Sequence, residues 1–320
     1  MNLIVPSRRT GSSMPATLAP DLDRAAELAL EEKAAATRRA YGSDFRIFEA
    51  WCQTRAVSAL PANPEAVAAF LAHDVETGSR PSTLGRRVAA IRYAHKLAGH
   101  VTPTDDERVK ATMRGIRRSL GTASQKKAPA TADRIVAMAR AADDSLKGLR
   151  DRALLLVGFA GAFRRSELVA LNIEDLEETD LGFKVTIRHS KTDQEGAGQT
   201  VAIMKGSAAC PVAALRTWIT ASGIASGAIF RSVRKGGKVG GRLTAQSVAD
   251  IVKIYAKCVG LDPALFAGHS MRAGFLTSAA KRGASIFKMM DQSRHKSVET
   301  LRGYVRDAEL FKDHAGTGLL

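Results

Sequence analysis

Cysteine is scarce in this sequence, and its placement argues against two classes of small domain. The 320 residues contain three cysteines, Cys52, Cys210 and Cys258, which are odd in number and far apart. This set does not form the framework of a disulfide-rich scaffold, and no CxxC pair or Cys/His spacing indicates zinc. Aromatic residues are also few, at 5% of the chain against 45% hydrophobic residues, which predicts cores built from aliphatic side chains.

Long apolar segments are absent as well. The longest candidate, ALLLVGFAGAF at 153–163, is followed by two arginines and is shorter than the ~18 residues that a membrane span needs. The N-terminal segment lacks the apolar core of a secretion signal, so 1–21 is interpreted as a flexible tail and the protein as cytoplasmic. The Gly/Lys segment at 234–241 lacks the GxxxxGK[ST] order of a phosphate-binding P-loop, which predicts a surface loop there.

Acidic residues are outnumbered. The chain has 32 Asp and Glu against 48 Lys and Arg, which gives a net charge of +16. Such an excess favours a polyanionic partner, and nucleic acid is the first candidate. Three alternatives stay open: ribosomal proteins are basic but usually smaller, membrane-surface proteins concentrate charge on one amphipathic helix, and Arg/Ala-rich proteomes contain mildly basic enzymes.

The length suggests about two domains. Residues 22–120 carry apolar residues at helical spacing, which predicts a helical bundle with a helix break near Gly42-Ser43. Asn63 followed by Pro64 predicts a helix start, and Thr104 with Glu107 has the spacing of a capping box.

The small, polar and basic segment 121–130 is predicted to be an interdomain linker. In 131–320 the helical period gives way to two runs of β-formers, GFKVTIRHS and QTVAIMK, which predict antiparallel strands. The predicted fold class is therefore mainly α with a small antiparallel β-sheet: a helical bundle followed by an α+β domain.

Two helices of the first domain are dense in arginine. A run of basic residues is most often a solvated face, but these runs share one sign and lie in a basic protein, which favours contact with phosphate. One helix carries Arg86, Arg87 and Arg92, and the other carries Arg108, Lys110, Arg114, Arg117 and Arg118.

Four stretches of the second domain place unusual polar residues beside apolar helix. Each alone is weak, because a salt bridge at a helix end, a solvated lysine in a turn or a packed aromatic explains it equally well. GAFRRSELVAL holds Arg164 and Glu167 at i, i+3, HSKTD holds Lys191 at the tip of the predicted hairpin, AGHSMRAGF holds His269 and Arg272 at a helix start, and RHKSVETLRGYVR holds His295 nine positions before Tyr304.

In this order, the four stretches resemble the tyrosine recombinase or phage integrase family, with its pattern Arg…Lys…His-x-x-Arg…His-(x)8-Tyr. The likeness extends over about 22–310, and the first half resembles the DNA-binding domain of Cre-like site-specific recombinases. The resemblance implies cleavage and rejoining of duplex DNA through a 3′-phosphotyrosyl intermediate and Holliday-junction strand exchange. It further implies a homotetramer on two paired sites, with the C-terminal tail docked on a neighbouring protomer, and an enzyme associated with the nucleoid.

The residue types suit this chemistry. Attack on a phosphodiester builds negative charge that Arg164 and Arg272 can stabilise, and His269 and His295 can donate to the phosphate or move protons. Tyr304 would be the nucleophile, and the resemblance makes Lys191 the acid that protonates the leaving oxygen. Glu167 is expected to orient a neighbouring side chain, and no metal or other cofactor is expected.

Base contacts are expected from the first domain, through Arg86, Arg87, Arg92 and Arg117. Two rival functions remain: a type IB topoisomerase, which uses the same tyrosine chemistry but reseals the original strand, and a non-catalytic DNA-binding protein on the same fold.

Overall fold

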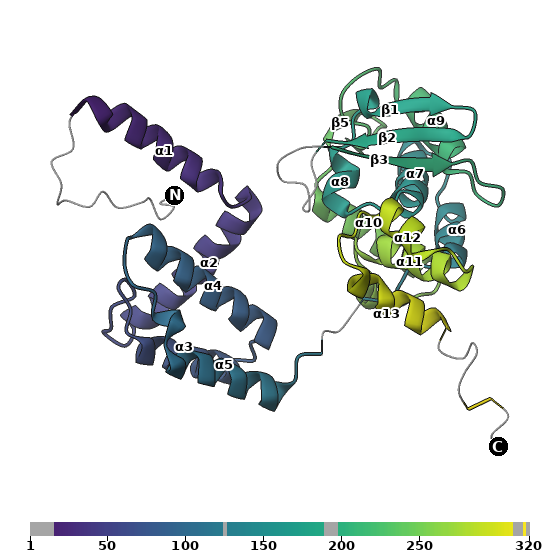
Figure 1. Cartoon of the computed structure of the whole chain (residues 1–320). Coiled ribbons are helices and arrows are strands. Elements are labelled where there is room, and N and C mark those ends of the chain that lie inside the picture. The colour runs from purple at the N-terminus through teal and green to yellow at the C-terminus, as the bar shows by residue number, and fades with distance from the viewer. Residues whose placement is uncertain (1–15, 124–126, 189–197, 310–315, 318–320) are drawn as a thin grey trace. The chain divides into compact units, whose positions relative to one another are not determined.

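The computed structural model describes residues 16–123, 127–188, 198–309 and 316–317. The chain divides into two compact units, residues 1–125 and 126–320 (Figure 1). Among the described helices, none is both long and apolar enough to cross a membrane.

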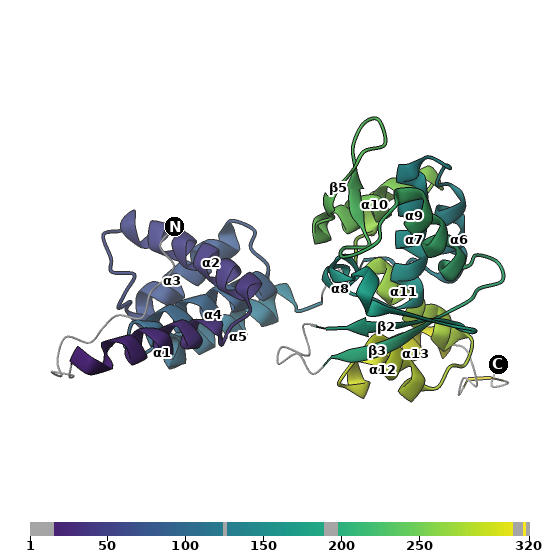
Figure 2. The same ribbon diagram turned by 90° about the horizontal axis from the view of Figure 1, so that it is seen from above.

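The first unit is a helical bundle in which α2 packs against α4 and α3 against α5 (Figure 2). Short 3-10 turns precede α1 and α5. Its elements are η1 (Ala16–Leu18), α1 (Ala19–Glu31), α2 (Ala35–Gln53), α3 (Pro64–Glu76), α4 (Pro81–Leu97), η2 (Pro103–Asp105) and α5 (Glu107–Leu120).

Aromatic side chains form the centre of this bundle. The rings of Phe48 and Phe70 are fully buried and meet edge to face with centroids 5.1 Å apart, and Trp51 lies 5.5 Å from Phe70. Such pairs add about 0.5–1.5 kcal/mol each beyond the area that they bury. Most other buried members of this core are aliphatic, as expected, and they include Val67, Leu71 and Leu84.

The helix boundaries follow side-chain capping only in part. Asn63 accepts a hydrogen bond from the backbone N–H of Glu65, which confirms the predicted start of α3. The predicted break near Gly42-Ser43 is wrong, since α2 runs through it and the break lies at 32–34. The capping box is also wrong: Asp106, rather than Thr104, caps α5 by accepting from the N–H of Arg108.

The second unit combines eight described helices with two small sheets. Its helices are α6 (Ala132–Arg140), α7 (Leu146–Ala160), α8 (Arg165–Ala170), α9 (Pro211–Ser222), α10 (Ala245–Cys258), α11 (Ser270–Lys281), α12 (Ile286–Ser293) and α13 (Val298–Glu309), with 3-10 turns η3 (Ile173–Asp175) and η4 (Pro263–Leu265). Its strands are β1 (Leu176–Thr179), β2 (Gly182–Ile187), β3 (Gln199–Met204), β4 (Arg231–Val233) and β5 (Val239–Arg242).

The larger sheet has the strand order β1-β2-β3, with both pairs antiparallel. Val185 pairs with Val201 and Phe183 with Ile203, so the buried face of the sheet consists of facing apolar pairs. This confirms the two predicted strands. The surface loop predicted at 234–241 is present over 234–238, as the exposed turn of the β4–β5 hairpin, while 239–241 belong to β5.

Helix α7 is the centre of this unit and packs against α6, α9 and α11 (Figure 2). Its apolar run is explained by burial on nearly all sides rather than by a membrane. Gly158 lets α11 approach closely, because a Cβ at this position would lie 2.8 Å from the side chain of Met271. The first turn of α11 is thereby held next to the turn that follows α7.

Candidate active site

The turn between α7 and α8 positions the first candidate arginine. Ala162 has a φ of +45°, in the left-handed region, and Phe163 after it is buried. Arg164 then forms the N-cap of α8, and its guanidinium Nη1 donates to Glu167 Oε1 at 2.6 Å. The predicted i, i+3 pair of Arg164 and Glu167 is thus present in the structure.

Glu167 is a buried carboxylate with three donors. Besides the Arg164 guanidinium, it accepts from the Arg164 backbone N–H at 2.9 Å and from Arg294 Nη2 at 2.8 Å. Burial alone would raise the pKa of Glu167, but the charge of Arg294 and the hydrogen bonds of Arg164 outweigh burial and lower this pKa. Glu167 is therefore ionised at neutral pH and fixes the direction of Arg164.

Arg272, in the first turn of α11, is completely buried. Its Nη1 donates to the carbonyl oxygen of Ala162 at 2.8 Å. Burial, together with the neighbouring charges of Arg164 and Arg294, lowers the pKa of Arg272 to about 9, which leaves it protonated at neutral pH. Arg164 and Arg272, predicted from separate stretches, are thus brought to the same turn.

His295 is held in one tautomer by Ser293. The Ser293 hydroxyl donates to the carbonyl of Met289 at 2.6 Å, and His295 Nδ1 lies 2.7 Å from the same oxygen. Because a hydroxyl has only one proton, Nδ1 must carry its own and donate to Ser293. The other ring nitrogen, Nε2, then has a free lone pair, and Arg272 Nη2 lies 3.3 Å from each of the two ring nitrogens.

The environment keeps both histidines neutral. Burial, followed by the charges of Arg272 and Arg164, lowers the pKa of His295 to about 4. His269 is the residue before α11, as predicted, and it is exposed to solvent. Partial burial of the ring and the charges of Arg272 and Arg164 lower the pKa of His269 as well.

Tyr304 lies on α13, which packs against α11 and α12. The residue is half-buried against a small apolar cluster that includes Leu276, Met289 and Leu301. Burial raises the pKa of the Tyr304 phenol, and the charge of Arg272 acts in the opposite direction. Among the described residues, none forms a hydrogen bond with its hydroxyl. Lys191 falls outside the described residues.

Sequence patterns did not point to Arg294 or Ser293. The Arg294 side chain is 2% exposed and makes four hydrogen bonds within the site. Arg294 is one of several basic residues in the stretch RHKSVETLRGYVR, and nothing in that pattern indicates that its side chain is buried. Ser293 likewise ends α12 without any marked pattern around it.

Three of the four arginines proposed to contact bases are already engaged by acidic groups of their own unit. Arg86 donates from Nε and Nη2 to the buried carboxylate of Asp44, at 2.6 and 3.1 Å. Arg87 forms an ion pair with buried Asp74, and Arg92 donates to Asp105 at 2.6 Å and to a threonine.

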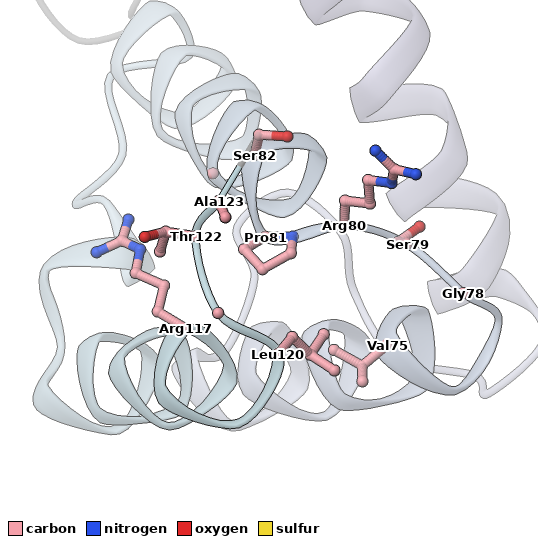
Figure 3. Close-up of a pocket in the computed structure, with 12 residues that line it drawn as sticks. Val75, Gly78, Ser79, Arg80, Pro81, Ser82, Arg117, Leu120, Thr122 and Ala123 are labelled. Atoms are coloured by element: carbon pink, nitrogen blue, oxygen red, sulfur yellow. The ribbon is translucent and has the colours of Figure 1, made fainter. Parts of the chain in front are cut away.

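Arg117 differs from these three, since no ion pair or hydrogen bond joins its side chain to a described residue. It is exposed and lines a pocket in the first unit, together with the N-terminal end of α4 (Figure 3). Arg80 and the hydroxyl-bearing residues Ser79 and Thr122 also line this pocket. The DNA contacts of all four arginines remain predictions.

The charge of the site is supplied mainly by arginine side chains. Within residues 16–123, 127–188, 198–309 and 316–317, no cluster of three or more His, Cys, Asp or Glu side chains could hold a metal ion. The site instead has three guanidinium groups, of Arg164, Arg272 and Arg294, around the single carboxylate of Glu167. Such a cluster keeps excess positive charge and suits a phosphate group.

Comparison with known proteins identifies the class. A model described as "Phage integrase family" matches residues 130–310, and one described as "Phage integrase, N-terminal SAM-like domain" matches residues 25–100. The chain therefore belongs to the phage integrase family, which confirms the resemblance predicted from the four stretches.

Individual relatives are similar over most of the chain. An integrase/recombinase XerD homolog of Selenomonas ruminantium is 41% identical over 292 residues, which cover 89% of this chain and 85% of the relative. Recombinase Cre of Escherichia phage P1 is 24% identical, with 82% of each chain covered. A lambda integrase dimer bound to a COC′ core site has the same fold, with a TM-score of 0.63 at 17% identity, covering 95% of this chain and 84% of that chain.

Proposed function

We propose that this chain is a site-specific DNA recombinase that cleaves and rejoins duplex DNA through a 3′-phosphotyrosyl intermediate on Tyr304. Family membership and the recombinases among its relatives support this function. The observation that carries it is the cluster of three guanidinium groups around one carboxylate, with Tyr304 on a helix packed against the helix of Arg272.

In the proposed reaction, the scissile phosphate binds between Arg164 and Arg272, which stabilise the charge that develops on its non-bridging oxygens. The Tyr304 oxygen attacks phosphorus, and its proton passes to His269, which is neutral at pH 7 and able to accept it. The bond from phosphorus to the 5′ oxygen breaks, and Lys191 supplies the proton that this oxygen needs to leave.

His295 contacts Arg272 Nη2 with its ring and so helps to orient Arg272, and Glu167 orients Arg164. The phosphotyrosine keeps the bond energy until a 5′-hydroxyl attacks it, so exchange between strands needs neither ATP nor metal. This is the basis for strand exchange through a Holliday junction.

The test uses a suicide duplex that is nicked beside the scissile phosphate and carries a site recovered by sequencing covalently trapped DNA. Wild-type protein should form a covalent adduct that survives denaturation, with or without EDTA. Tyr304→Phe should bind the duplex with unchanged affinity and form no adduct. Absence of an adduct from wild-type protein that binds the same duplex would rule out both recombinase and topoisomerase activity and favour a DNA-binding protein.

A type IB topoisomerase would also form the adduct, so a second assay separates it from a recombinase. A recombinase exchanges strands between two duplexes that carry the site, whereas a topoisomerase relaxes supercoils as a monomer and gives no exchange product. The 41% identity to an integrase/recombinase favours exchange.

Assembly and domain roles complete the proposal. Residues 22–120 bind DNA, 121–130 link the domains and 131–320 carry the chemistry, with the tail after Tyr304 docked on a neighbouring protomer of a tetramer on two paired sites. The net charge of +16 and the DNA-bound recombinases of the same fold support DNA as the partner. Because its substrate is DNA, the enzyme is proposed to act in the cytoplasm, at the nucleoid.

A further inference from the structure

Arg294 occupies a backbone conformation that is unusual for its residue type. Its φ is +57° and its ψ +42°, in the left-handed region that favours glycine. Only three non-glycine residues among those described have a positive φ: Ala56, Ala162 and Arg294. Two of these three belong to the candidate active site and are joined by a hydrogen bond, from Arg294 Nη2 to the carbonyl of Ala162 at 3.0 Å.

The guanidinium of Arg294 bridges three parts of the fold. Nη1 donates to the carbonyl oxygens of Gly161 and Gln292, at 2.9 and 2.7 Å. Nη2 donates to Ala162 and, at 2.8 Å, to Glu167 Oε2. The end of α12, the turn after α7 and the first turn of α8 are therefore held together by one buried cation.

Both candidate phosphate-binding arginines depend on groups that Arg294 contacts. Arg164 is directed by Glu167, whose other oxygen binds Arg294, and Arg272 donates to the Ala162 carbonyl that Arg294 shares. Arg294 also supplies the largest opposing charge that keeps the buried Glu167 carboxylate ionised. Both Nη atoms of Arg294 donate twice within the protein and its Nε is buried, so no donor of its guanidinium is left for a phosphate.

We propose that Arg294 is a positioning residue for strand cleavage: it binds the Glu167 carboxylate and the Ala162 carbonyl, and so fixes the guanidinium groups of Arg164 and Arg272 in their working geometry. This proposal rests on the recombinase function proposed above. It predicts that loss of Arg294 impairs the chemical step and leaves DNA affinity nearly unchanged.

The first test compares Arg294→Met and Arg294→Lys with wild type on the nicked suicide duplex. Arg294→Met should lower the first-order cleavage rate by about 100-fold, since a small displacement of reacting groups has an effect of this size. Its dissociation constant for the duplex should change by less than about threefold, which is a change of under about 0.7 kcal/mol in binding free energy. Arg294→Lys keeps the positive charge but loses the planar guanidinium with its two Nη donors, so it should recover part of the cleavage rate.

The pH profile separates positioning from a structural role. Without Arg294, the pKa of buried Glu167 rises, so Glu167 becomes protonated as the pH falls and no longer orients Arg164. The cleavage rate of Arg294→Met should therefore decline more steeply than that of wild type between about pH 8 and pH 5. Adding Glu167→Gln to Arg294→Met should remove this extra pH dependence, because the carboxyl that titrates is gone.

Arg150→Met is the matched control. Arg150 is another buried arginine of the same unit, 5% exposed, paired with buried Asp151 through bonds of 2.6 and 2.8 Å. It should lower the melting temperature to a similar degree as Arg294→Met and leave the pH profile of cleavage unchanged.

Several outcomes would overturn the proposal. These are cleavage by Arg294→Met within about threefold of wild type, the same pH profile with and without Glu167→Gln, or loss of cooperative melting and DNA binding in both Arg294 variants. If wild-type protein forms no adduct, the recombinase function fails instead. In that case the link between Arg294 and Glu167 is tested by stability alone. The loss of folding stability of Arg294→Met as the pH falls should depend on whether Glu167→Gln is also present.

Discussion

His295 is a histidine that the fold keeps uncharged. Its pKa is lowered to about 4 by burial and by Arg272 and Arg164, against about 6.5 in an unfolded chain. Between these values the unfolded state binds a proton that the folded state does not, so folding stability should fall as the pH drops from about 6.5 to about 4.

Replacing His295 by Gln removes this titrating group while keeping a polar side chain, so the variant should lose less stability over the same pH range. Denaturant midpoints measured at several pH values test this expectation. Part of the dependence should persist in the variant, because the pKa of His269 is lowered too. Equal slopes for the variant and wild type would contradict the assignment to His295.

At the scale of residues, sequence patterns predicted the pairings that are local in the chain and missed those that depend on tertiary contacts. Arg164 and Glu167 form their ion pair because they lie three positions apart at a helix start. Arg294 meets the same Glu167 from 127 positions away, and no periodicity records such a contact. The tautomer of His295 was equally hidden, since it depends on where the Ser293 proton points.

Secondary structure elements were predictable where their own residues determine them. The β2–β3 pair and the start of α3 follow from alternation and a cap, and both are confirmed. Strand β1, with the sequence LEET, has three exposed residues of four and forms because β2 offers it a free edge. The break after α1 was missed because Gly42, a weak helix former, lies inside α2 in open space.

Gly274 in α11 provides a test of packing between elements. A Cβ there would lie 1.8 Å from the carbonyl oxygen of Ala130, whose N–H donates to the carbonyl of Ser270 at 2.9 Å. Gly274→Ala should force this backbone away from α11, cost about 1–3 kcal/mol and lower the melting temperature of the second unit by several degrees. Gly115→Ala is the control of opposite sign, because nothing lies within 4 Å of that position and alanine favours a helix. Equal melting shifts would contradict the close contact.

At the scale of the whole molecule, the net charge of +16 does not show which arginines are available to DNA. Many of the arginines of α4 and α5 are paired with acidic residues: Arg86 with Asp44, Arg87 with Asp74 and Arg108 with Glu65. The excess charge must therefore be divided into cations that stabilise the fold and cations that can release counterions from DNA.

Arg117 is exposed and unpaired among the described residues, so it can release counterions from DNA, whereas Arg87 is paired with Asp74 and stabilises the fold. If Arg117 contacts phosphate, Arg117→Gln should reduce the slope of log K against log salt by about 0.9, the value for one phosphate contact. Arg87→Gln should instead lower the melting temperature, because it leaves the buried carboxylate of Asp74 without its ion pair. Fluorescence anisotropy on a duplex from about 50 to about 200 mM salt measures the slope for both variants and wild type. An unchanged slope for Arg117→Gln would remove Arg117 from the DNA interface.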